Sequence, residues 1–314
     1  MARKKGRGSK GTVGQVGLGI MGGAFARHLL DAGFHVIGYD PSGKAVRALK
    51  KAGGEVARSA AEVARRASVI ITSLPSPGAM EAAYFGKDGI AAGALPGAVV
   101  IEASTMTLEL KEKIRRRLAR QRVQLLDCPI SGTGAQAAAK DIVVYASGDR
   151  AAFRRHRKVF DGFARGTYYC GEFGTGSKLK FVANLLVTIH NLSTAEAMVV
   201  GEKAGLDLAL LFKVIADGAG SSRMFQVRGS MMVNGHYLPP HMKSEIYQKD
   251  IDIIDAFARR MRCPTPLFSG SLPYYTAALK QGWGKHDTAA IHAVLRKRAG
   301  LRGRLRRRST RKGK

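Results

Sequence analysis

A lysine and an asparagine stand four residues apart in a segment that is otherwise apolar, and both side chains can take part in chemistry. Residues 179–189 are apolar except for Lys180, Asn184 and Thr188. Residues spaced by four lie on one side of a helix, so these three form a narrow polar stripe. An amine in register with an amide suits proton transfer and hydrogen bonding to a small molecule. The alternative is a solvent-facing stripe, although an exposed helix face is usually broader.

A second candidate site lies near the N-terminus, in the sequence VGQVGLGIMGGAFARHLLDAG. It contains Gly17-x-Gly19-x-x-Gly22 between a predicted strand and a predicted helix. There the first glycine allows a tight turn, the second lets the backbone approach a pyrophosphate, and the third lets the helix pack on the strand. The helix N-terminus then offers free N–H groups to phosphate oxygens. The pattern predicts a dinucleotide site, and a plain glycine-rich turn is the alternative.

The choice of dinucleotide depends on Asp40, which ends the next predicted strand. It lies 23 residues after Gly17, close to the usual spacing for the acid that binds a ribose 2′-hydroxyl. A carboxylate repels a 2′-phosphate, so Asp40 favours NAD. Because Lys44 and Arg47 follow closely, NADP stays open.

The elements that must position these residues change type along the chain. From residue 12 to residue 149, β-rich runs alternate with helical stretches, which predicts a parallel sheet covered on both faces. After Gly176 the sequence predicts only helices, beginning with a long one over residues 177–204. The prediction is an α/β fold, in which a Rossmann-type doubly wound domain (12–173) is followed by an all-α domain (174–293). The predicted strands fall within 13–18, 35–40, 68–75, 97–104, 123–129 and 141–148.

The charge of the chain is concentrated at its ends. The net charge is +29, with five basic residues in 1–10, eleven in 296–314, and no acid in either stretch. The remainder holds 36 basic against 23 acidic residues. Polybasic segments without apolar periodicity cannot bury enough surface to fold, so residues 1–11 and 294–314 are predicted to be disordered. Such tails favour weak, non-specific contact with polyanions.

Cysteine usage and hydropathy bear on the compartment. Cys128, Cys170 and Cys263 are odd in number, widely spaced and without a CxxC pair, which is typical of a reducing compartment without structural disulfides or zinc. The eight histidines show no metal-ligand spacing, so no metal is predicted. No apolar run approaches the ~20 residues of a membrane span, and the basic N-terminus lacks a signal-peptide core. The expected location is the cytoplasm.

Four motifs together resemble the β-hydroxyacid dehydrogenases, the family of 3-hydroxyisobutyrate dehydrogenase, tartronate semialdehyde reductase and the glyoxylate/succinic semialdehyde reductases. They are GLGIMG, DCPISGT, GEFGTGSKLKFVAN and YQKDIDI, and the resemblance covers about residues 12–293. The third motif matches the family pattern G-x-x-G-x-G-x-x-x-K-x-x-x-N at every fixed position. The resemblance implies hydride transfer between NAD(P) and a small 3-hydroxy acid or semialdehyde. It also implies a homo-oligomer, a dimer or tetramer formed through the helical domain.

The resemblance assigns roles to individual residues. Lys180 becomes the general acid/base, with a pKa lowered to roughly 7–8 by apolar neighbours and the cationic nicotinamide. Asn184 holds the substrate or the lysine. Substrate binding, chiefly of a carboxylate, falls to Ser131, Gly132, Thr133 and Met242. Cofactor binding falls to Gly17, Gly19, Ile20, Met21, Gly22, Asp40, Leu74, Pro75, Thr105 and Lys249.

The chain departs from the family pattern in two places, and other functions stay open. The substrate loop reads SGTGAQ where the family has S-G-G, and Met242 stands where several relatives place phenylalanine. Residues 131–133 could be a plain loop, and Lys249 with Asp250 a surface ion pair. One rival is a non-catalytic module that binds polyanions through its tails. Another is an imine reductase, against which Lys180 argues. The 6-phosphogluconate dehydrogenases share the lysine motif but have a far longer helical domain.

Overall fold

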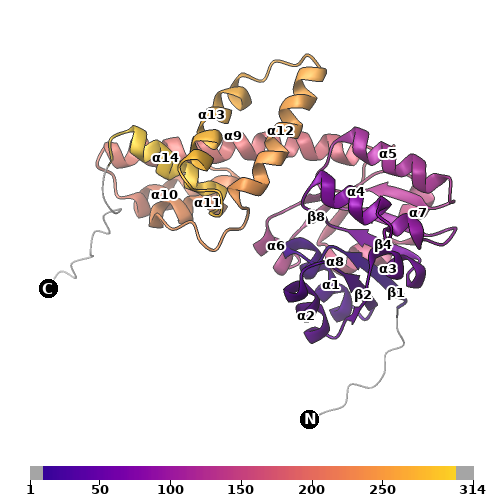
Figure 1. Cartoon of the computed structure of the whole chain (residues 1–314). Helices are drawn as coiled ribbons and strands as arrows, with labels where there is room; N and C mark the ends of the chain where they lie inside the picture. Colours follow the sequence, from indigo (N-terminus) through magenta and orange to yellow (C-terminus); the bar gives the residue numbers. More distant parts are fainter. Residues whose placement is uncertain (1–9, 302–314) are drawn as a thin grey trace, which may run out of the picture. The chain divides into compact units, whose positions relative to one another are not determined.

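The computed structural model describes residues 10–301, shown in Figure 1. Its contacts divide the chain into two units, the first ending at Lys180 and the second beginning at Phe181. The predicted disorder of residues 1–9 and 302–314 lies outside the described residues. Among the described residues, the prediction of a disordered tail from residue 294 is wrong, because the helix Ile291–Arg298 (α14) continues through residue 294.

The first unit is built on a parallel sheet. The strands are ordered β3-β2-β1-β4-β5-β6, as predicted for a Rossmann-type domain. The order reverses beside β1, and ligands of such sheets bind outside the carboxyl ends of the strands at that switch point. In the register, the last residues of four adjacent strands are Val16, Thr72, Glu102 and Asp127. The strands are β1 (Thr12–Val16), β2 (His35–Tyr39), β3 (Glu55–Val56), β4 (Val69–Thr72), β5 (Val99–Glu102) and β6 (Gln124–Asp127).

Helices cover both faces of this sheet, because its central strands are apolar on both sides. VIIT of β4 and VVIE of β5 are completely buried. One buried cluster includes apolar side chains of α1 and α8, and the other those of α3, α4 and α5. The doubly wound arrangement is therefore confirmed. The helices are α1 (Ile20–Asp31), α2 (Gly43–Lys51), α3 (Ala60–Arg66), α4 (Pro77–Phe85), α5 (Leu108–Ala119) and α8 (Arg157–Phe163), with a 3₁₀ turn at Ile90–Ala92.

A separate three-stranded sheet corrects one prediction. The strand predicted within residues 141–148 exists as β8 (Val143–Ala146), but it pairs with β7 (Ile130–Ser131) and β9 (Gly166–Tyr169). The pairing of β7 with β8 is antiparallel. The chain leaves the parallel sheet because only residues 128–129 separate β6 from β7, whereas a parallel crossover needs a dozen residues or more. Two short helices complete this region, α6 (Gly134–Ala138) and α7 (Arg150–Arg155).

The second unit consists of helices joined by loops over residues 181–301, without a strand, as predicted. The long helix α9 (Thr175–Lys203) begins in the first unit and continues into the second. No helix of the described chain is long and apolar enough to cross a membrane. The remaining helices are α10 (Leu208–Asp217), α11 (Arg223–Asn234), α12 (Ser244–Arg260), α13 (Pro266–Lys280), a 3₁₀ turn at Thr288–Ala290, and α14.

Candidate active site

The three glycines of the N-terminal loop meet three different steric demands. Gly17 has a φ of +86°, and a Cβ there would lie 2.2 Å from the carbonyl oxygen of Ser73. A Cβ on Gly22 would lie 2.0 Å from the carbonyl oxygen of Gly17. A Cβ on Gly19 would meet no atom within 4 Å, so its surface is open. This division into a turn, an open surface and a close packing contact fits a pyrophosphate laid over Gly19.

The N-terminus of α1 is prepared for an anion. Gly19 is its N-cap, no side chain caps it, and its first turn contains no acidic residue. Its N–H groups and partial positive charge are therefore available to phosphate oxygens. Ile20 is exposed and Met21 is half-buried beside this terminus.

Asp40 directly follows β2 and binds the glycine loop by a hydrogen bond. Its Oδ2 accepts the N–H of Leu18 at 2.7 Å, and its Oδ1 accepts the N–H of Ser42 at 2.8 Å. The carboxylate thus both fixes the loop and places negative charge beside it. In folds of this type an acid at the end of the second strand is the one expected to bind a ribose hydroxyl.

The loops after β4 and β5 lie at the same edge of the sheet as the glycine loop. The N–H of Leu74 donates to Ser104 Oγ at 2.8 Å, which joins the two loops. Pro75 is exposed and Thr105 is half-buried. Every predicted cofactor residue of the first unit thus follows the carboxyl end of β1, β2, β4 or β5.

A buried polar network lies under these loops, and sequence reasoning missed it. The Nζ of Lys111 contacts Asp127 Oδ1 at 2.7 Å and Glu102 Oε1 at 4.0 Å, and all three side chains are fully buried. Glu102 also accepts hydrogen bonds from Thr72 and, at 3.2 Å, from Tyr84. Burial, followed by the charge of Glu102, raises the pKa of Tyr84. The aligned strand ends of β4, β5 and β6 supply three of its members.

The predicted substrate loop combines a glycine of positive φ with a capped helix. Ser131 ends β7, and Gly132 has a φ of +145°. The hydroxyl of Thr133 accepts the N–H of Gln136 at 3.3 Å, and Gln136 Oε1 accepts the N–H of Thr133 at 3.0 Å. Thr133 and Gln136, which both belong to the loop that departs from the family pattern, therefore bind each other as a capping box of α6.

The polar stripe of α9 faces inward, which rules out a solvent-facing stripe. Asn184 is 4% exposed and Thr188 is 0% exposed, and Lys180 is half-buried. Apolar residues take the exposed positions instead, with Val182 at 56% and Leu186 at 46%. The stripe is therefore part of a buried polar arrangement.

An acid from α12 holds the amide of this stripe. Asn184 Nδ2 donates to Asp250 Oδ2 at 3.0 Å, and Lys249 Nζ lies 2.6 Å from Asp250 Oδ1. Asp250 is buried, so the Lys249–Asp250 pair is not a plain surface ion pair. The motif YQKDIDI contained Asp250, but only the structure shows that it binds Asn184. In the same unit, the N–H of Met242 donates to Asp287 Oδ2 at 2.9 Å.

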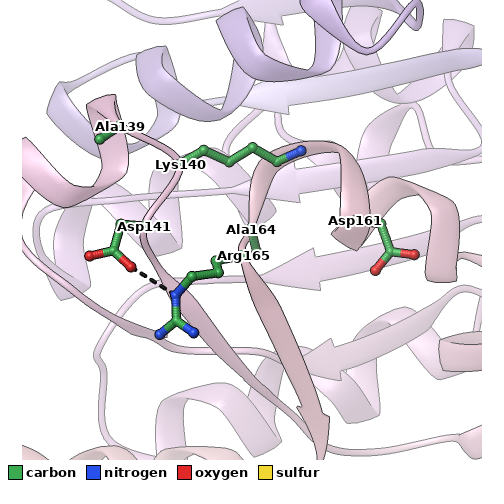
Figure 2. Close-up of a pocket in the computed structure, with 6 residues that line it drawn as sticks. All are labelled: Ala139, Lys140, Asp141, Asp161, Ala164 and Arg165. Atoms are coloured by element: carbon green, nitrogen blue, oxygen red, sulfur yellow. Dashed lines mark hydrogen bonds and ion pairs between the residues drawn. The ribbon is translucent and has the colours of Figure 1, made fainter.

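One hollow of the first unit lies away from these residues. It has a volume of about 540 Å³ and is lined by residues of the α6–β8 loop, by Asp161 of α8 and by the two residues that follow α8. Figure 2 shows these residues and the ion pair of Arg165 with Asp141, in which Nε lies 2.8 Å from Oδ1. The lining of the hollow contains none of the predicted site residues. Because this hollow is shallow, the strand edge remains the better candidate for binding a dinucleotide.

The fold and the glycine loop define a nicotinamide-dinucleotide-binding oxidoreductase. Residues 12–171 match the family model described as the NAD binding domain of 6-phosphogluconate dehydrogenase. Residues 174–295 match the model described as NAD-binding of NADP-dependent 3-hydroxyisobutyrate dehydrogenase. The chain belongs to the β-hydroxyacid dehydrogenase family. It is an NAD(P)-dependent enzyme that transfers hydride to or from a small hydroxy acid or semialdehyde.

Individual relatives agree with this assignment over nearly their whole length. The chain is 34% identical to L-threonate dehydrogenase of Escherichia coli (strain K12), over 92% of this chain and 96% of that one. It is 30% identical to an NAD-dependent L-serine dehydrogenase of Pseudomonas aeruginosa, over 89% of this chain and 96% of that one. The crystal structure of 3-hydroxyisobutyrate dehydrogenase from Salmonella typhimurium is similar to this one with a TM-score of 0.83. The sequence identity is 33%, and the match covers 90% of this chain and 99% of that one.

Proposed function

We propose that Lys180 is the general acid/base of this dehydrogenase and that Asn184 orients the reacting group. The bound dinucleotide supplies the hydride acceptor or donor. In alcohol oxidation, the amine of Lys180 takes the hydroxyl proton, and in reduction the ammonium returns it. The observation that supports this most strongly is the inward-facing stripe, in which Asn184 and Thr188 are buried and Lys180 is half-buried one turn before Asn184. Asn184 donates one N–H to Asp250, which fixes the plane of its amide.

The glycine loop and Asp40 are proposed to hold the dinucleotide, with NAD preferred. The open surface of Gly19 and the uncapped start of α1 support a pyrophosphate there. The carboxylate of Asp40 supports a ribose with a free 2′-hydroxyl. Leu74, Pro75 and Thr105 extend the site along the strand edge, and Lys249 stays assigned to the cofactor by family resemblance.

The proposed substrate is a small hydroxy acid whose carboxylate is bound by the backbone at Ser131 and Gly132. The names of the relatives support this class, since L-threonate, L-serine and 3-hydroxyisobutyrate are all short hydroxy acids with a carboxylate. Because Thr133 caps α6, we assign its contribution to loop shape. Met242 stays a candidate for contact with the substrate side chain.

A substrate panel tests this function. L-threonate, L-serine and 3-hydroxyisobutyrate are supplied separately with NAD or NADP, and reduced cofactor is followed by its absorbance. We expect at least one acid to be oxidised at a rate far above that of a Lys180→Ala blank. Equal rates with wild type and variant for every acid would contradict the proposal.

We further propose that the enzyme is a homo-oligomer formed through its helical unit. Leu210 and Val214 are each more than half exposed and are four residues apart, so they form an apolar pair on one side of α10, and the exposed Leu206 lies just before the start of this helix. Exposed apolar groups of this kind are typical of subunit interfaces. Light scattering coupled to gel filtration is expected to give a dimer or tetramer, and Leu210→Glu with Val214→Glu is expected to shift it toward monomer. A monomeric wild type would contradict this.

Two smaller proposals concern the setting of the enzyme. We place it in the cytoplasm, which its three free cysteines support.

We also propose that basic residues 1–10 and 296–314 make weak contacts with polyanions. Removing residues 1–9 and 302–314 is expected to lower the salt needed to elute the protein from heparin and to leave kcat within about twofold. Unchanged elution would contradict the polyanion proposal.

A further inference from the structure

The first turn of α9 is held by a carboxylate from a distant strand. The first backbone N–H groups of a helix have no partner within it, and α9 carries no acid in its own first turn. Asp127, at the end of β6, supplies one. Its Oδ2 accepts the N–H of Ser177 at 2.8 Å, and its Oδ1 accepts the hydroxyl of Ser177 at 2.7 Å. Ser177 precedes Lys180 by less than one helical turn.

Backbone contacts make this attachment tight. The N–H of Gly176 donates to Ser147 Oγ at 3.0 Å, and that hydroxyl lies 3.2 Å from Asp127 Oδ2. A Cβ on Gly176 would lie 2.3 Å from the carbonyl oxygen of Tyr145 and 2.9 Å from that of Asp127. The start of α9 therefore sits directly on β6 and β8, and the last glycine of the lysine motif permits it.

Stability alone does not explain the buried charges that surround Asp127. Lys111 lies between Asp127 and Glu102, and all three are fully buried. Burying such charges costs desolvation, and well-packed apolar residues often stabilise a core equally well. On its other side, Glu102 Oε1 accepts the N–H of Ser104 at 2.6 Å, next to the predicted cofactor residue Thr105. The three charges thus link two segments that the reaction needs.

We propose that Asp127, with Lys111 as its counter-ion, is a positioning residue of the reaction, which fixes the first turn of α9 and through it the amine of Lys180. This inference rests on the proposed role of Lys180. It gives the acid of the DCPISGT motif a function that is separate from substrate binding. A displacement of about 1 Å at a reacting group can cost about 100-fold in rate, so loosening this turn is costly.

The test is a double-mutant cycle between this attachment and the lysine. Asp127→Asn weakens the attachment strongly. Ser177→Ala removes one hydroxyl and leaves the Lys111–Asp127 pair in place, so it serves if Asp127→Asn does not fold. Each is made in wild type and in Lys180→Ala, and kcat, KM and the Kd for NAD are measured. Asp149→Asn is the matched control, because exposed Asp149 caps α7 through the N–H of Ala152 at 2.6 Å, a contact that does not involve α9.

We expect Asp127→Asn to lower kcat by about 10- to 100-fold and Ser177→Ala by a smaller factor, with the Kd for NAD within about twofold. In the Lys180→Ala background the same changes should lower the residual kcat by less than about twofold, because they act through the lysine. Asp149→Asn should leave kcat unchanged. Equal losses in both backgrounds, or a parallel loss of NAD binding, would overturn the inference. If Lys180→Ala alone leaves kcat unchanged, the proposed function itself fails.

Discussion

Replacing Gly19 by alanine separates cofactor binding from folding, because this glycine faces open space. A Cβ at this position meets no protein atom within 4 Å, and the residue has an ordinary φ of −63°. The change at the N-cap should therefore cost at most about 1 kcal/mol of unfolding free energy. The same methyl group would occupy the space over the start of α1 that a pyrophosphate needs. The variant should fold normally and bind NAD weakly.

The size of the binding loss follows from the contacts at stake. A hydrogen bond to a charged group contributes about 1.5–3 kcal/mol, so losing one phosphate contact raises Kd by about 10- to 160-fold. Gly22→Ala should behave differently, because its Cβ would lie 2.0 Å from a backbone oxygen and the loop cannot yield without losing stability. Gly78→Ala is the matched control, since Gly78 is an open glycine in the first turn of α4.

Calorimetric titration with NAD and denaturant unfolding are measured on all three variants. The expected pattern is a weak binder of normal stability for Gly19→Ala, a less stable protein for Gly22→Ala, and wild-type behaviour for Gly78→Ala. If Gly19→Ala binds NAD as tightly as wild type, the dinucleotide does not lie over this loop.

Two other predictions follow from single side chains. Because Asp40 would repel a 2′-phosphate, wild type should favour NAD over NADP at least several-fold in kcat/KM, and Asp40→Ser should narrow the ratio; equal use of both cofactors by wild type would contradict this. His292 is fully buried, and burial lowers its pKa to about 4. Since the unfolded chain protonates below about pH 6.5, stability should be full above that pH and fall by about 2 kcal/mol by pH 5. His292→Gln should lose that part of the pH dependence in denaturant unfolding, and an identical pH dependence in both proteins would refute the assignment.

The order of the elements was predictable from the sequence because its signals are local. The helices begin at side chains that cap them in the structure, such as Ser59, Ser76 and Thr107, and the apolar strands between them are short and regular. The two-residue strands β3 and β7 carry no such periodicity. Neither was predicted, and because β7 starts the small second sheet, that sheet was not predicted either.

The residues of the candidate site are also of two kinds: some are identified by local sequence patterns, and others are brought together only by the fold. The glycine loop and the Lys180 stripe are contained in short segments, and their spacing could be read directly. In the sequence, Lys111 is one of several basic residues of the segment that forms α5, and nothing local distinguishes it. Only the packing of α5 against the sheet buries it. Asp250 lies 66 residues from the amide that it binds, so no local pattern could identify that contact.

The most direct test of the central claim compares catalysis with cofactor binding in Lys180→Ala and Lys180→Arg. General acid/base catalysis contributes about 10²–10⁴-fold, so Lys180→Ala should lower kcat by that factor and leave the Kd for NAD within about twofold. Lys180→Arg should fail nearly as badly, since a guanidinium stays protonated. In alcohol oxidation the wild-type rate should rise with pH as the amine loses its proton, and that limb should vanish in Lys180→Ala. Equal losses of kcat and NAD binding would show that Lys180 is structural, and the account would be contradicted.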